Sequence, residues 1–287
     1  MQIILKGTKD NEKDGFENFF CSDAAYSSFF IASCGSSTDG NVKNAAYEII
    51  DDQGAIIQLE HKPERILTLA MGTDSIVLGI LPEEKLIAIN SLADDPVSSN
   101  IVDKANRITR KIKNPSAEEI LSLKPDVVFI YNWGKAEMVD NLRELGIKVV
   151  VVKGPKSIAD VKENVKLIAK TLGEEDKGNL MIAKMDDKLA EIKEKVDNIK
   201  PEERKKLVLI SLMTSYGGKG CTFDDICQYA GVINGVSDAG LHNGQLLTKE
   251  MLVAINPDLL IMPVYNDHNT FDIEKYNKEF LDDPALQ

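Results

Sequence analysis

The chain has 287 residues, a length that fits two domains of about 100–150 residues each. Hydrophobic residues make up 43% of the sequence and charged residues 28%, so the chain has enough apolar side chains to form globular cores. Its formal net charge of −12 argues against a nucleic-acid partner, because nucleic-acid binding needs a basic surface. No apolar run reaches the roughly 18 residues of a membrane-spanning helix.

Residues 1–34 are predicted to be a leader that ends like a bacterial lipobox. In that motif small residues precede a cysteine whose thiol is lipidated, and here Ile31 to Ser33 precede Cys34. Residues 35–46 are small and polar, as in a flexible tether. Acidic residues interrupt the part before the motif, which is not typical of a secretion signal. Lipidation of Cys34, which would anchor the protein to a membrane through acyl chains, and a chance match both stay open.

From residue 47 onward, the hydrophobic pattern alternates between strands and helices. A hairpin is predicted first, because two short strands flank a turn at 51–54. The predicted strands are 47–50, 55–59, 65–70, 86–90, 127–130, 148–152, 207–212 and 259–262. The sequence therefore predicts an N-terminal lobe at 47–156, a linking helical segment at 157–200 and a C-terminal lobe at 201–287.

Residues 116–130 are repeated, without a gap, at 248–262. In each copy a Ser or Thr (Ser116, Thr248) is suited to cap a helix, and a glutamate two residues later lies in its first turn. A Pro-Asp pair then ends the helix, and an apolar run typical of a buried parallel strand follows. The repeat predicts two similarly built lobes, although helix–Pro-Asp–strand units are also common in unrelated α/β proteins.

Several short motifs carry a resemblance to a known family. They are Asp52-x-Gly54, Lys62-Pro63-Glu64-Arg65-Ile66, Gly72-Thr73-Asp74, Leu123-Lys124-Pro125-Asp126, Leu145-Gly146-Ile147-Lys148-Val149, Ala230-Gly231-Val232-Ile233-Asn234 and Ile255-Asn256-Pro257-Asp258. From about residue 47 to 287, the chain resembles the substrate-binding proteins of ATP-driven (ABC) importers for iron chelates, haem and cobalamin. The resemblance implies an α/β fold of two Rossmann-like lobes with mostly parallel sheets, joined by a long helix, with the ligand cleft between the lobes.

The resemblance also implies partners and a location. In that family one glutamate on each lobe docks into arginines of the membrane permease, which works with an ATPase, and the matching residues here are Glu118 and Glu250. A purely helix-dipole role for these two glutamates is the alternative. The expected protein is an extracytoplasmic monomer, lipid-anchored or periplasmic, without a cofactor and without enzymatic activity. Family members usually continue beyond the point that corresponds to residue 287, so the C-terminal lobe is expected to be incomplete.

The ligand site is expected where the carboxyl ends of the strands of both lobes face each other. The candidate residues are Met71, Gly72, Thr73, Asn90, Tyr131, Asn132 and Trp133 in the first lobe, and Met213, Ser215, Tyr216, His242, Tyr265 and Asn266 in the second. Flat aromatic side chains such as Trp133 suit a macrocycle or a bulky chelate. Trp133 as mere lobe packing and His242 as an ordinary surface histidine remain the alternatives.

Two other function classes have weaker support. A free zinc or manganese site needs several converging histidines and carboxylates, and the chain has only 3 histidines. A two-lobed enzyme resembling glycosyltransferases is less favoured because no phosphate-binding glycine motif and no nucleophile-elbow motif occurs, so neither catalytic nor metal-binding residues are predicted. Cys221 and Cys227 could form a disulfide or remain buried thiols.

Overall fold

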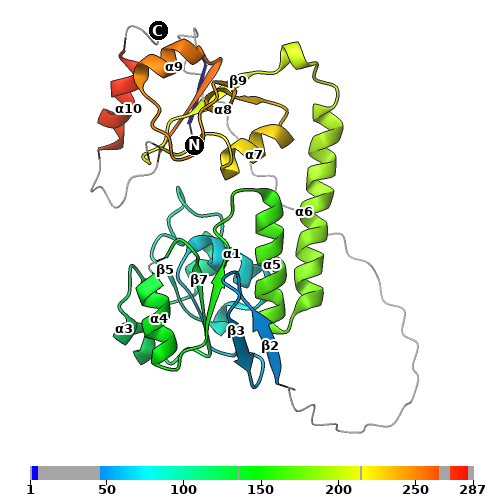
Figure 1. Ribbon diagram of the computed structural model, residues 1–287, viewed down its shortest axis with the longest axis vertical. Helices are drawn as coiled ribbons and strands as arrows, with labels where there is room; N and C mark the ends of the chain where they lie inside the picture. Colours follow the sequence, from blue (N-terminus) through cyan, green and yellow to red (C-terminus); the bar gives the residue numbers. More distant parts are fainter. Residues whose placement is uncertain (1, 6–45, 135, 214, 265–271, 284–287) are drawn as a thin grey trace, which may run out of the picture.

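The computed structural model describes residues 2–5, 46–134, 136–213, 215–264 and 272–283. The chain forms two α/β lobes that lie one above the other in Figure 1, and helix α6 (Glu175–Val196) runs along one side from the lower lobe to the upper one. We call residues 47–172 the N lobe, and residues 206–281 with 2–5 the C lobe. Among the helices of the described ranges, none is long and apolar enough to cross a membrane.

The N lobe is built on a parallel sheet of five strands in the order β6-β5-β4-β7-β8. The strands are β4 (Ile66–Thr68), β5 (Leu86–Asn90), β6 (Lys111–Ile112), β7 (Val127–Tyr131) and β8 (Val149–Val152). Every residue of β7 and β8 is buried, as expected for strands that are covered on both faces. Strands β5 and β7 confirm the strands that the sequence predicts at 86–90 and 127–130.

Helices cover both faces of this sheet. They are α1 (Met71–Ile80), α2 (Val102–Ala105), α3 (Ala117–Ser122), α4 (Ala136–Glu144) and α5 (Ile158–Leu172), with a 3-10 turn at Glu83–Lys85. Buried side chains of α1 and α5 share one core with the sheet, and those of α3 and α4 share the other. The hairpin of β2 (Tyr47–Ile50) and β3 (Ile56–Leu59) packs beside α5, where the Tyr47 hydroxyl donates to the Thr171 carbonyl at 2.6 Å.

The C lobe has a smaller sheet, in the order β1-β11-β9-β10. Its strands are β1 (Gln2–Leu5), β9 (Lys206–Leu209), β10 (Ile233–Asn234) and β11 (Leu259–Met262), and its helices are α7 (Thr222–Tyr229), α8 (Gly235–Asp238), α9 (Lys249–Ile255) and α10 (Ile273–Leu281). The pairs of β9 with β10 and β11 are parallel, whereas β1 pairs with β11 in antiparallel fashion. Residues 2–5, which the sequence analysis assigns to the leader, thus lie at the edge of this sheet.

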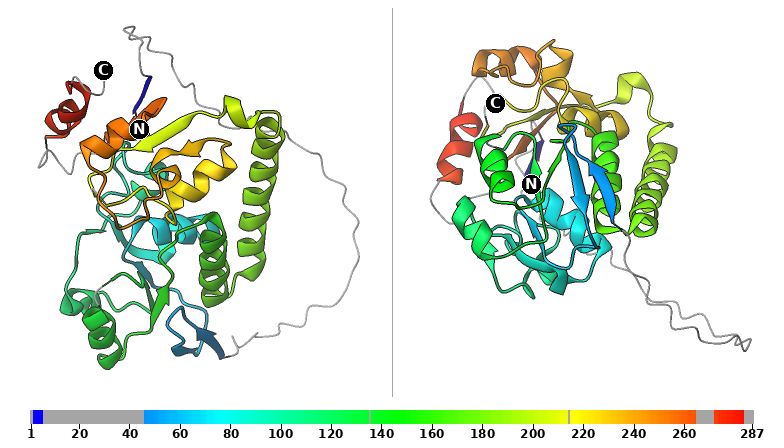
Figure 2. Two further views of the ribbon diagram at one scale, coloured as in Figure 1. Left: turned by 45° about the horizontal axis from the view of Figure 1, so that its top comes forward. Right: turned by 60° about the horizontal axis from the view of Figure 1, so that its bottom comes forward.

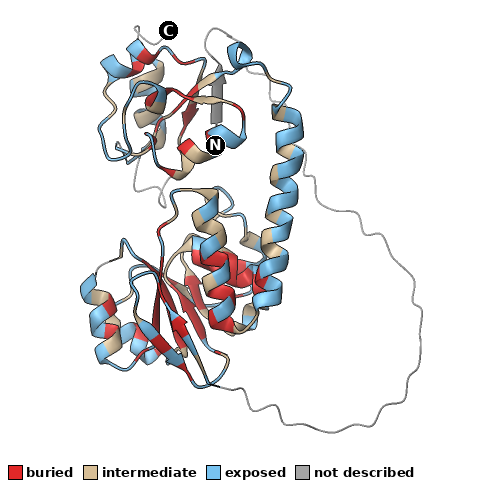
Figure 3. Ribbon diagram, turned by 45° about the vertical axis from the view of Figure 1, so that its right-hand side comes forward, coloured by how far each residue is buried: buried red, intermediate tan, exposed pale blue. Residues whose placement is uncertain are grey.

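The linking segment contains two helices that pack against each other. Helix α5 ends at Gly173, which has a left-handed φ of 64°. Helix α6 then turns back along α5 in close contact, since a Cβ placed on Gly178 would lie 2.4 Å from that of Ala169. Figure 2 shows the two helices side by side in both views. Figure 3 shows that α6 is mostly exposed as it runs to the C lobe, after which a 3-10 turn (Pro201–Glu203) leads into β9.

The sequence repeat is a structural repeat. The hydroxyls of Ser116 and Thr248 cap α3 and α9 by accepting hydrogen bonds from the N–H groups three residues later. A residue with left-handed backbone follows each helix at the equivalent position, Lys124 (φ 51°) after α3 and Asn256 (φ 48°) after α9. The prediction of two similarly built lobes is confirmed in these details.

The aspartate of each Pro-Asp pair fixes the start of the neighbouring strand. The Asp126 carboxylate accepts from the Arg65 N–H at 2.9 Å, and the Asp126 N–H donates to the Arg65 carbonyl at 2.8 Å. Asp258 makes the same two contacts with Lys206, both at 2.8 Å. Each repeat thus sets the register between its own strand and the first parallel strand of its lobe.

Candidate functional site

A cavity of about 640 Å³ lies at the carboxyl ends of β4, β5, β6 and β7 in the N-lobe sheet. Its volume lies in the range of small-molecule sites, which is roughly 300–1,000 Å³. Three of the predicted ligand residues, Asn90, Tyr131 and Trp133, line it together. The lining residues that the sequence analysis did not identify include Leu92, Ile112, Lys113, Pro115 and Met138.

Trp133 contributes its indole ring to the wall of this cavity. Trp133 is the second residue after β7, and its side chain is 66% exposed, which is unusual for a tryptophan. Its ring centroid lies 4.4 Å from that of Tyr131, with the rings tilted by 36°. On another side the ring lies on the backbone of the buried Gly154, where a Cβ would come within 2.0 Å of the indole. Tyr131 and Gly154 therefore both contact the indole, while most of the side chain stays exposed.

Tyr131 is the buried partner of this aromatic pair. Its hydroxyl lies over Gly72, where a Cβ would be 2.3 Å away, so the glycine at the start of α1 leaves room for the tyrosine. Burial, together with the charge of Asp74, raises the pKa of Tyr131 to about 12. The phenol therefore stays neutral and packs in the floor of the cavity.

Asp74 lies beneath the cavity and is fully buried. Its carboxylate accepts hydrogen bonds from the Thr68 hydroxyl and, at 3.2 Å, from the Asn90 N–H. Burial raises the pKa of Asp74 to about 7, although these two hydrogen bonds and Lys111 act in the opposite direction. The contact with Asn90 ties the rim of the cavity to the first turn of α1. Thr73, a predicted ligand residue, is also buried and donates to the Ala70 carbonyl, whereas Met71 is partly exposed.

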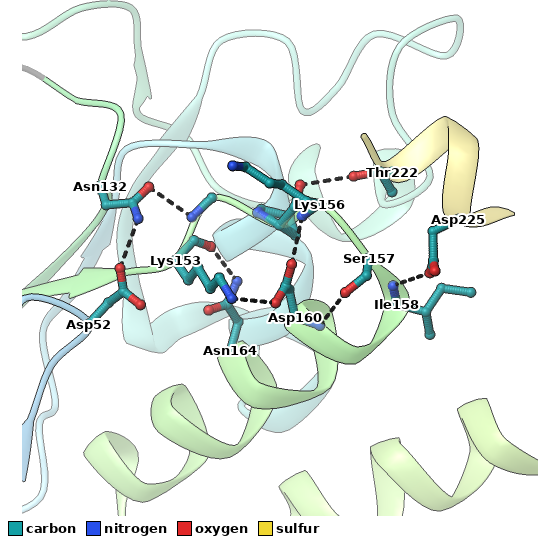
Figure 4. Close-up of polar contacts among 12 residues, drawn as sticks. Asp52, Asn132, Lys153, Lys156, Ser157, Ile158, Asp160, Asn164, Thr222 and Asp225 are labelled. Atoms are coloured by element: carbon teal, nitrogen blue, oxygen red, sulfur yellow. Dashed lines mark hydrogen bonds and ion pairs between the residues drawn. The ribbon is translucent and has the colours of Figure 1, made fainter. Parts of the chain in front are cut away.

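The side chain of Asn132 connects two loops of the N lobe. Its amide nitrogen donates to the Asp52 carboxylate at 2.8 Å, and its amide oxygen accepts from the Gly154 N–H at 3.0 Å (Figure 4). Both ends of the amide are thus engaged within the lobe. Asn132 consequently fixes the position of the glycine on which Trp133 lies.

Two of the predicted ligand residues in the C lobe have exposed side chains. Met213 is 63% exposed and His242 is exposed. Ser215 accepts a backbone hydrogen bond from Gly244 at 2.7 Å, and Tyr216 is partly buried, which raises the pKa of its hydroxyl. The predicted residues Tyr265 and Asn266, like Cys34, lie outside the described residues.

A buried polar cluster that the sequence analysis missed holds this loop. The Asn234 amide donates to the Asp224 carboxylate and to the Gly217 carbonyl, both at 2.9 Å, and the Gly220 N–H donates to Asp224 at 3.0 Å. Asp224 and Asn234 are only 8% and 5% exposed. The sequence did contain a signal for this cluster, because Asp224 lies in the first turn of a helix and Asn234 lies at the end of a strand. Asp74 and Asn90 of the N lobe, which also contact each other, hold the same two kinds of position.

Two hydrogen bonds join α7 of the C lobe to the start of α5 and the segment just before it in the N lobe. The Thr222 hydroxyl donates to the Pro155 carbonyl at 2.9 Å, and the Ile158 N–H donates to the Asp225 carboxylate at 2.7 Å (Figure 4). Pro155 directly follows Gly154, so this contact lies next to the support of Trp133.

Glu118 and Glu250 hold equivalent exposed positions in the two lobes. Each lies in the first turn of its capped helix, and hydrogen bonding to its own backbone N–H, followed by the capping hydroxyl, lowers the pKa of its carboxyl group. Both side chains are therefore carboxylates that face solvent. In the described parts of the chain, no group of three or more His, Cys, Asp or Glu side chains is placed to hold a metal ion. Cys221 and Cys227 are buried free thiols.

Two facing α/β lobes, a single long connecting helix and an aromatic cavity at the strand ends define a two-lobed binding protein for small molecules. The chain belongs to the periplasmic binding protein family, whose sequence model matches residues 72–287. Members of this family are non-enzymatic substrate-binding components of ABC transporters, so the predictions of the family, the fold class and the absence of enzymatic activity are confirmed.

Individual proteins resemble the chain in sequence or in fold. An uncharacterised ABC transporter substrate-binding lipoprotein of Bacillus subtilis, YvrC, is 24% identical over 80% of this chain and 76% of its own length. The iron-uptake system-binding protein of the same organism is 29% identical over 47% of this chain and 41% of its own length. The solved structure of the haem-binding protein HmuT superposes with a TM-score of 0.62 at 21% identity, over 80% of this chain and 75% of HmuT.

Proposed function

We propose that the chain captures a metal chelate, either an iron–siderophore complex or haem or cobalamin, between its lobes and delivers it to a membrane permease. The observation that carries this proposal is the cavity of about 640 Å³ with the exposed Trp133 indole at the strand ends of the N lobe. A cavity of this size, lined by aromatic and apolar groups with a few polar ones, suits a bulky organic ligand.

The cavity lining supports a complete chelate over a free metal ion. Among the described residues, none of its lining side chains is a carboxylate, a histidine or a cysteine, which are the usual protein ligands of zinc and manganese. Lys113 is the charged residue of the lining, and it favours a neutral or anionic ligand. The names of the iron-uptake and haem-binding relatives point the same way.

Delivery would use the two equivalent glutamates. Glu118 and Glu250 are exposed carboxylates on the two lobes, so together they can meet two basic pockets of a permease and fix its orientation. The name of the YvrC relative, a lipoprotein, supports an extracytoplasmic location with a lipid anchor at Cys34.

The direct test is a titration of the purified chain with haem, cyanocobalamin, a ferric hydroxamate, a ferric catecholate and zinc or manganese. Trp133 is the only tryptophan, so its emission reports on the cavity itself. Saturable quenching by one chelate, corrected for absorbance and repeated by calorimetry, is the expected outcome. A folded protein that responds to none of the chelates, or to the free metals alone, contradicts the proposal.

A further inference from the structure

The contacts that orient the Trp133 indole indicate which kind of ligand surface fits the cavity. The Trp133 side chain is largely exposed, and two neighbours contact its ring. The Tyr131 ring supports it at a centroid distance of 4.4 Å. The backbone of Gly154 lies against its six-membered ring, where a Cβ would be 2.0 Å from Cε3 and 2.2 Å from Cζ3.

Gly154 is required here for space and not for its backbone angles. Its φ lies outside the left-handed region, so an alanine could adopt the same backbone without strain. The methyl group of that alanine would nevertheless overlap the indole, and the indole would have to move from its position beside the Tyr131 ring. Asn132 holds Gly154 in place by accepting its N–H at 3.0 Å, so the glycine cannot easily retreat.

The indole lines the cavity and is largely exposed, so it offers a ligand an accessible flat surface. Conjugated ring systems stack on such a surface in offset geometry and gain energy beyond simple area burial. The remaining walls include apolar side chains such as Leu92, Ile112 and Met138, which suit the edges of a flat ligand. Asn90 and Ser91 add polar groups on one side, where they can fix its orientation.

We propose that the ligand binds through a flat conjugated face stacked on the Trp133 indole, and that Gly154 is the positioning residue that orients this indole. This inference rests on the proposed function and narrows its substrate class. Tetrapyrroles and aromatic catecholate chelates present such a face, whereas aliphatic hydroxamate chelates do not.

The test compares four forms of the full chain by isothermal calorimetry: the wild type, Gly154→Ala, Trp133→Ala and the double variant. The probes are haem, cyanocobalamin, a ferric tris(catecholate) and an aliphatic ferric tris(hydroxamate). A conjugated probe should bind the wild type, and each single substitution should weaken it about tenfold, which is the value of a good aromatic contact. Because Gly154 acts through the indole, the double variant should bind no worse than Trp133→Ala alone.

A spectroscopic readout separates positioning from general damage. Without ligand, Gly154→Ala should shift the Trp133 emission, because the ring leaves its support. Gly79→Ala is the matched control, since its methyl group meets only the flexible end of Met181 and should change neither emission nor affinity. Circular dichroism checks that all variants fold.

Three results would overturn the inference. The first is tight binding of the conjugated probe by both Gly154→Ala and Trp133→Ala. The second is additive losses in the double variant, which would mean that Gly154 acts independently of the indole. The third is binding of the aliphatic hydroxamate alone, which would leave the proposed function standing but remove the stacking. Failure of all four probes to bind the wild type would instead overturn the proposed function, and this inference with it.

Discussion

The carboxylate of Asp225 in the C lobe accepts a hydrogen bond from the backbone N–H of Ile158 in the N lobe, with an oxygen–nitrogen distance of 2.7 Å. Ile158 is the first residue of α5, so one lobe caps a helix of the other. Thr222 and Pro155 add a second hydrogen bond beside it. Pro155 directly follows Gly154, which brings the junction of the lobes next to the indole of Trp133.

The first prediction concerns this junction. Replacing Asp225 by Ala and Thr222 by Val removes both hydrogen bonds, each worth about 1 kcal/mol, and should widen the range of lobe separations. Small-angle X-ray scattering of the ligand-free protein should then give a larger radius of gyration. Asp225→Asn is the control, because its amide oxygen can still accept from Ile158. Identical scattering from the double variant and the wild type would show that α6 alone fixes the lobes.

The second prediction concerns Asp74 and pH. Because burial raises its folded-state pKa from 3.8 to about 7, the folded protein holds this proton more tightly than the unfolded chain does. The contribution of Asp74 to the free energy of unfolding therefore falls as the pH rises from about 4 to about 7, and it changes no further above that range.

Asp74→Asn should remove this dependence. Its amide can accept from the Asn90 N–H and donate to the Thr68 hydroxyl, so the contacts of the folded state are kept without a charge. The difference in melting temperature between variant and wild type should be more favourable to the variant at pH 8 than at pH 5. Asp140→Asn makes the same change on the exposed surface of the lobe and serves as the control. A difference that does not vary with pH argues against a buried ionising carboxyl group.

The features that could be predicted from the sequence are those that depend on local patterns. The cap, the helix end and the strand of each repeat lie within 15 residues of one another, and Ser116 and Thr248 cap their helices as the pattern indicates. Trp133 could be predicted as a ligand residue because it lies just past the end of a buried strand. Strand ends are easy to recognise, and the ends of parallel strands share one edge of the sheet.

The features that could not be predicted depend on contacts between distant segments. Asn132 also follows a strand, but its amide bonds to Asp52, 80 residues away, and to the Gly154 N–H. The role of Gly154 depends on how the β8 end approaches Trp133, which no local pattern encodes. The contact between Asp225 and Ile158 spans 67 residues and both lobes.

The third prediction concerns the loop of the C lobe. Asn234→Ala removes the two donors that hold Gly217 and Asp224, and a buried carboxylate that loses a partner costs about 1–3 kcal/mol. The variant should unfold at lower denaturant concentration and bind the ligand more weakly, because the loop that carries Tyr216 loses its support. Asn198→Ala, which changes an exposed asparagine at the end of α6, is the matched control. Unchanged affinity together with lower stability would limit Asn234 to a folding role.

The fourth prediction concerns delivery to the permease. Glu118→Arg combined with Glu250→Arg places positive charges where two basic pockets are expected, and like charges across an interface oppose docking. Uptake of the ligand by cells should fall to background, while calorimetry on the purified variant should give the wild-type affinity, because neither side chain lines the cavity. Asp187→Arg with Glu194→Arg, on the exposed side of α6, introduces the same change in charge and should leave uptake intact. Loss of ligand binding in the Glu118 and Glu250 variant would assign these residues to the ligand site, and normal uptake would exclude them from docking.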